Sequence, residues 1–135
     1  MDVGTWISKG SILADTMKAY WSFSFEVVES DEPVILTLEA ALNAWADGSG
    51  GEGDFFGLVD SLNRTIQFLF VDSIPDDFED AGQLSIVLVD FPVPERRGSW
   101  SKIVTITESS ALIEKAFRVG ASFADFEGLE FSSWD

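Results

Sequence analysis

The sequence predicts an α+β fold in which an antiparallel sheet of about five to six strands carries two main helices on one face. Three observations predict this fold. Several segments alternate apolar and polar residues, as half-buried strands do. Two other segments place apolar residues three and four apart, which is typical of amphipathic helices. Hydrophobic residues make up 46% of the 135 residues, which is enough for one packed core without disulfides or a structural metal.

The N-terminal region shows no clear period. It predicts either a loosely ordered arm over 1–19 or a short helix around 7–17. From Tyr20 onward four apolar residues alternate with polar ones, which predicts a half-buried strand. These apolar residues are Trp21, Phe23, Phe25 and Val27. The polar segment 29–33 is expected to end the strand.

A helix is expected after Thr37, because its hydroxyl can cap the first turn. The apolar side of this helix would consist of Leu38, Ala41, Leu42 and Trp45. Gly48, Gly50 and Gly51 are expected to end the helix and begin a flexible loop.

Four further strands are expected in an antiparallel meander. They cover residues 55–60, 65–72, 84–91 and 100–107. The acidic segment 72–80 contains Pro75, which favours a long hairpin connection over a continued strand. Pro92 and Pro94 predict the turn before the last of these strands.

The second helix is expected to begin with Thr107 as its cap and Glu108 in its first turn, and to end before Gly120. A terminal strand is expected over 129–134. The chain shows no internal repeat and no linker, so a single domain over 1–135 is expected, with both helices on one face of the sheet.

Charge and composition exclude several classes of function. Twenty-four acidic residues against eight basic ones give a formal charge of −16. Such a field repels nucleic acid and anionic membranes and favours encounter with a basic protein. The chain has no His and no Cys, which excludes Ser–His and Cys–His catalysis and ordinary zinc sites. We expect no cofactor and no metal.

The chain shows neither a secretory leader nor an apolar run of about twenty residues that could span a membrane. The sequence therefore predicts a cytoplasmic protein.

The glycine-rich loop 47–54 fits neither a calcium-binding loop nor a phosphate-binding loop. Counted from Asp47, position six is Glu52 instead of Gly, and position twelve is Leu58 instead of Glu. No Gly-Lys-Ser or Gly-Lys-Thr follows that could bind phosphate. The loop is therefore interpreted as a flexible connection.

The acidic clusters are the candidate partner-binding residues. The first cluster is Asp72, Asp76, Asp77, Phe78, Glu79 and Asp80, and the second is Asp47, Glu52 and Asp54. In the first cluster Phe78 would be an apolar anchor, while the carboxylates would pair with Arg or Lys of a partner. The alternative is a solvated loop whose Phe78 packs against its own domain.

The C-terminal half resembles a family of immunity proteins that neutralise bacterial polymorphic toxins. The resemblance rests on the strands before residue 110, on the helix 110–120 and on the closing segment Leu129-Glu130-Phe131-Ser132-Ser133-Trp134. It implies a single-domain α+β inhibitor that blocks the active site of a nuclease or nucleic-acid deaminase. The chain departs from the family's usual ending at 125–127, where a turn containing Pro is common.

Three other functions remain open at the level of sequence. A phage-type inhibitor or DNA mimic that acts on a host defence nuclease requires the same acidic surface. A structural protein that dimerises through 21–27 would use its charge for solubility alone. A glycosidase needs only two suitably placed carboxylates, but most carboxylates here lie in polar loops, so no enzyme activity is expected.

Overall fold

The computed structural model describes residues 15–48, 50–75 and 80–135. Its strands are β1 (Thr16–Phe23), β2 (Glu26–Val28), β3 (Val34–Thr37), β4 (Phe55–Val59), β5 (Thr65–Phe70), β6 (Val87–Val93), β7 (Gly98–Val104) and β8 (Glu130–Ser133). Its helices are α2 (Leu38–Gly48) and α3 (Ile106–Val119), with short 3-10 helices η1 (Ala81–Gln83), η2 (Pro94–Arg96) and η3 (Phe123–Asp125).

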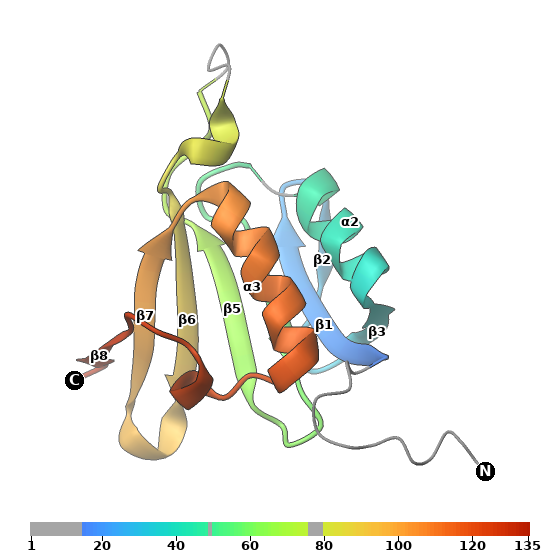
Figure 1. The fold of residues 1–135 in the computed structure, drawn as a ribbon. Coiled ribbons are helices and arrows are strands. Elements are labelled where there is room, and N and C mark those ends of the chain that lie inside the picture. Colours follow the sequence, from blue (N-terminus) through green and yellow to red (C-terminus); the bar gives the residue numbers. More distant parts are fainter. Residues whose placement is uncertain (1–14, 49, 76–79) are drawn as a thin grey trace.

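The strands form one open antiparallel sheet in the order β2-β1-β4-β5-β6-β7-β8. Strand β3 pairs with the first half of β1 and β2 with its second half. Both helices cover the same face of the sheet (Figure 1). The predicted α+β class and the placement of the helices are therefore confirmed.

The sheet has eight strands, so the predicted number of five to six was wrong. The alternating segment up to Val27 is not one strand, because the chain turns at Ser24 and Phe25 and continues as β2. Strand β3 was not predicted, since only four residues separate Pro33 from α2.

The first strand begins earlier than expected. Thr16–Ala19 belong to β1, where they pair with 34–37 of β3. The rest of the predicted arm or helix, 1–14, lies outside the described residues.

Both helices begin at a threonine cap. The Thr37 hydroxyl accepts a hydrogen bond from the Ala40 backbone N–H at 3.1 Å, as predicted. The cap of α3 is Thr105 and not Thr107, because Glu108 lies three residues after Thr105 and completes a reciprocal capping box with it.

Strand β6 continues through Pro92, where a turn was predicted. Pro92 pairs with Ser99 of β7, while the pairing of β6 with β5 ends at Asp90. Proline has no backbone N–H to donate. It is tolerated at position 92 because β6 has no partner strand on the β5 side beyond Asp90.

The core lies between the sheet and the two helices. Trp45 of α2 is 2% exposed, and its ring packs against Phe56, Phe68 and Phe70 with centroid distances of 6.1, 5.8 and 5.1 Å. Its indole N–H donates to the Ser109 hydroxyl of α3 at 2.9 Å. Trp45 therefore joins both helices to the central strands β4 and β5.

The sheet has two ends, which the strand directions define. Strand β5 ends and β6 begins at the end where α2 leads into β4. The opposite end, called here the far end, consists of the turns 60–64 and 94–97.

None of the helices in the described residues is long and apolar enough to cross a membrane.

Asp60 organises the first turn of the far end. Its Oδ1 accepts hydrogen bonds from the backbone N–H groups of Leu62 and Arg64, and its Oδ2 accepts from Arg64 Nε and from the Ala121 N–H. Burial alone would raise the pKa of Asp60, but the Ala121 and Arg64 hydrogen bonds and the guanidinium charge hold it below its usual value. The carboxylate thus ties the β4–β5 turn to the segment that follows α3.

We expect Asp60→Asn to lower the free energy of unfolding by about 2 kcal/mol at pH 7, since Oδ2 would be replaced by a donor. A depressed pKa stabilises the fold above the usual value of 3.8, and this contribution is lost as the pH falls below it. Urea unfolding should therefore show the difference between the two proteins shrinking as the pH falls below about 4. The exposed Asp125→Asn is the control. Equal stability of Asp60→Asn and the unsubstituted protein at pH 7 would contradict this role.

Candidate partner-binding surface

The structure brings the two predicted acidic loops together. The Gly53 N–H donates to the Phe70 carbonyl at 2.8 Å, and the Phe70 N–H donates to the Asp54 carbonyl at 2.9 Å. Further along, the Ile74 N–H donates to the Gly50 carbonyl, and the Glu52 N–H donates to the Ser73 hydroxyl. The loop before β4 is therefore fastened to the segment after β5, although about twenty residues separate them in sequence.

We call this part of the molecule the acidic end and define it by Asp47, Glu52, Asp54, Asp72 and Asp80. Asp54 is half-buried, and its Oδ2 accepts a hydrogen bond from the Gly51 N–H at 3.2 Å. The other four residues are exposed. Asp80 directly precedes η1, and η1 contacts α3. The remaining predicted residues, Asp76, Asp77, Phe78 and Glu79, lie outside the described residues.

The acidic end is not neutralised by the described part of its own chain. Arg64 is the only basic residue between Lys18 and Arg96, and it lies at the far end. The ion pairs found in the described residues, Arg64–Asp60 and Arg97–Asp135, are both at the far end. Among the described residues, no ion pair therefore neutralises the carboxylates of the acidic end.

Two exposed apolar side chains accompany these carboxylates. Phe25, in the turn between β1 and β2, is 69% exposed, and Val71, directly after β5, is 42% exposed. Phe25 was not predicted to lie at the surface, because the alternation from Trp21 to Val27 assigned it to the buried face of a strand. Ser24 beside it was the available signal for a turn.

The opposite face of the sheet carries a polar row that no described helix covers. Tyr20, Gly57, Gln67 and Asp90 are in register across β1, β4, β5 and β6. Burial raises the pKa of Tyr20 to about 12, with a further contribution from the negative charge of Asp90. Burial likewise raises the pKa of Asp90, although a hydrogen bond with Ser99 opposes this.

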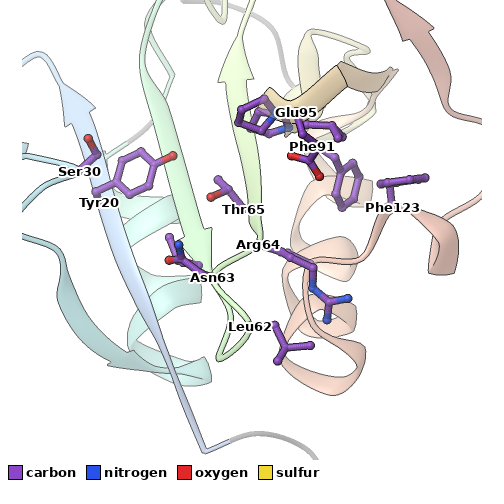
Figure 2. Close-up of a pocket in the computed structure, with 14 residues that line it drawn as sticks. Tyr20, Ser30, Leu62, Asn63, Arg64, Thr65, Phe91, Glu95 and Phe123 are labelled. Atoms are coloured by element: carbon purple, nitrogen blue, oxygen red, sulfur yellow. The ribbon is translucent and has the colours of Figure 1, made fainter. Parts of the chain in front are cut away.

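A cavity of about 570 Å³ lies at the far end of the sheet, between the β4–β5 turn and the end of β6. Figure 2 shows Tyr20, Arg64, Phe91 and Phe123 among its lining side chains. Among the described residues that line it, Glu95 is the only carboxylate. The cavity therefore does not supply the carboxylate pair that glycoside hydrolysis needs.

The described residues contain no group of three or more acidic side chains close enough to hold a metal ion.

Comparisons with protein-family models, with curated proteins and with solved structures give no match.

Proposed function

We propose that this protein binds a basic protein through its acidic end and acts as an immunity protein, inhibiting a bacterial toxin that is a nuclease or a nucleic-acid deaminase. The observation that carries the proposal is the joining of two acidic loops into one surface that contains no Lys or Arg among its described residues and carries the exposed Phe25.

Electrostatics gives the physical reason. A protein that acts on nucleic acid presents cationic side chains to phosphates. A negatively charged surface accelerates encounter with such a site and competes with the phosphates for it. Exposed apolar residues among charged ones provide the packed centre that a stable interface requires.

The C-terminal layout is a second support. Helix α3 is followed by a short connection and by β8, and Trp134 comes directly after that strand. This is the order of elements in the immunity-protein family that the sequence resembles.

The proposal is tested by capturing binding proteins from a lysate of the cells that produce this chain, at about 50 mM and about 500 mM salt. A basic nuclease or deaminase that is retained at low salt, and whose activity the purified protein inhibits, is the expected result. Capture of a defence nuclease would instead favour the phage-type inhibitor. Absence of any salt-sensitive partner would contradict both functions.

A further inference from the structure

A second cavity, of about 370 Å³, lies on the helix-free face close to the acidic end. We call it the tyrosine groove. The side chains that line it include Tyr20, Ser22, Val27, Glu29, Phe55 and Gln67. They come from β1, from β2 and the turn after it, and from β4 and β5. Phe55 follows Asp54 directly, so the groove adjoins the acidic end.

The aromatic wall of the groove is held in a fixed position. The Tyr20 hydroxyl donates a hydrogen bond to Gln67 Oε1 at 2.6 Å, and its ring meets that of Phe55 edge to face at 6.2 Å. The ring lies so close to Gly57 that a Cβ there would come within 2.3 Å of it. Only glycine at position 57 allows Tyr20 to lie across β4 and reach Gln67.

Among the described residues that line the groove, the only charged side chain is acidic, Glu29. Glu29 is exposed and forms no ion pair with any described residue. Asp90 lies in the same cross-strand row, and its charge acts on the Tyr20 hydroxyl. No Lys or Arg is among the described residues that line the groove. Lys18 is two residues from Tyr20 along β1 toward the far end, and Arg64 lines the neighbouring cavity.

We infer that the tyrosine groove binds a Lys or Arg side chain from an extended basic segment of the protein partner. The cation would lie against the rings of Tyr20 and Phe55, and the Glu29 carboxylate would balance its charge. Rings attract cations within about 6 Å, and more strongly when water is excluded. The apolar stem of the same side chain would contact Val27.

The surroundings of the groove disfavour a second copy of this chain as its occupant. Glu26, Glu29, Asp31 and Glu32 surround Val27 in sequence, and all four are exposed. Two copies joined here would bring these like charges together, which is destabilising. A basic segment would neutralise them instead. The inference rests on the proposed function only in taking the partner to be basic.

The inference is tested by NMR titration with a capped Gly-Arg-Gly peptide, matched by peptides in which neutral citrulline or Leu replaces Arg. We expect saturable shifts at Gly57, Gln67 and Tyr20 with the Arg peptide alone. Glu29→Gln should weaken binding about threefold, as expected for an exposed ion pair. Tyr20→Leu should weaken it about fivefold, whereas Tyr20→Phe keeps the ring and should bind nearly as well as the unsubstituted protein.

Several outcomes would overturn the inference. One is that the citrulline or Leu peptide binds as tightly as the Arg peptide. A second is that the Arg peptide shifts only resonances of the acidic end. A third is that, without any peptide, the Gly57 resonance shifts with protein concentration, which would indicate a second copy of the chain in the groove. Glu29→Gln keeps the test valid should Tyr20→Leu fail to fold. A groove that binds the Arg peptide while lysates yield no basic partner would count against the proposed function only. The other case is a toxin that binds the Glu29→Gln, Tyr20→Leu and Tyr20→Phe variants as tightly as it binds the unsubstituted protein. That result would count against the groove only.

Discussion

Trp45→Ala is expected to destabilise the protein by about 4 kcal/mol, within the range for removing a buried tryptophan. The substitution removes a ring that packs against Phe56, Phe68 and Phe70. The substitution also removes the hydrogen bond that the indole N–H donates to the buried Ser109 hydroxyl. Since native domains have about 5–15 kcal/mol in total, the variant should lose much of its stability.

Urea unfolding followed by circular dichroism measures this effect, and two variants separate its causes. Trp45→Phe keeps most of the apolar contact and loses the hydrogen bond, so we expect a loss of about 1–2 kcal/mol. Trp134→Ala is the matched control, because Trp134 is 54% exposed and lies beyond the last strand. If Trp45→Ala costs no more than Trp134→Ala, Trp45 does not join the helices to the sheet.

Reversing four carboxylates of the acidic end should weaken partner binding about 100-fold at low salt. The variant carries Asp47→Lys, Glu52→Lys, Asp72→Lys and Asp80→Lys. All four side chains are exposed, so the substitutions leave the core intact. Because the unsubstituted chain carries a charge of −16, they should not lower stability, and the loss of binding should shrink as salt rises.

A matched control reverses four exposed carboxylates elsewhere. It carries Glu95→Lys, Glu114→Lys, Asp125→Lys and Glu127→Lys, which change the net charge by the same amount. Isothermal titration calorimetry of both variants separates local pairing from the field of the whole molecule. Equal weakening by the two sets would show that only net charge matters and would remove the acidic end from the interface.

The sequence predicted the elements whose pattern is local. Helix α2 and its Thr37 cap, strands β4, β5 and β7, and the terminal strand β8 follow from periodicity and capping chemistry. The failures lie where tertiary pairing decides. Phe25 continues a perfect alternation, yet the pairing of Phe23 with Glu26 turns the chain there.

The candidate surface was predictable only in part. Composition identified the acidic loops, and Asp47 and Asp72 were both selected from sequence. The two loops lie together because the Gly53 N–H donates to the Phe70 carbonyl and the Phe70 N–H donates to the Asp54 carbonyl. No local sequence pattern predicts these hydrogen bonds. The tyrosine groove was not predicted, because its residues come from four strands and meet only through sheet register.

Amide hydrogen exchange on the purified complex decides whether the acidic end is the partner-binding surface. We expect slower exchange on binding in the segments 50–54 and 70–73, with little change at 95–97 and 118–121. Protection confined to the far end, with 50–54 and 70–73 exchanging as in the free protein, would contradict this expectation.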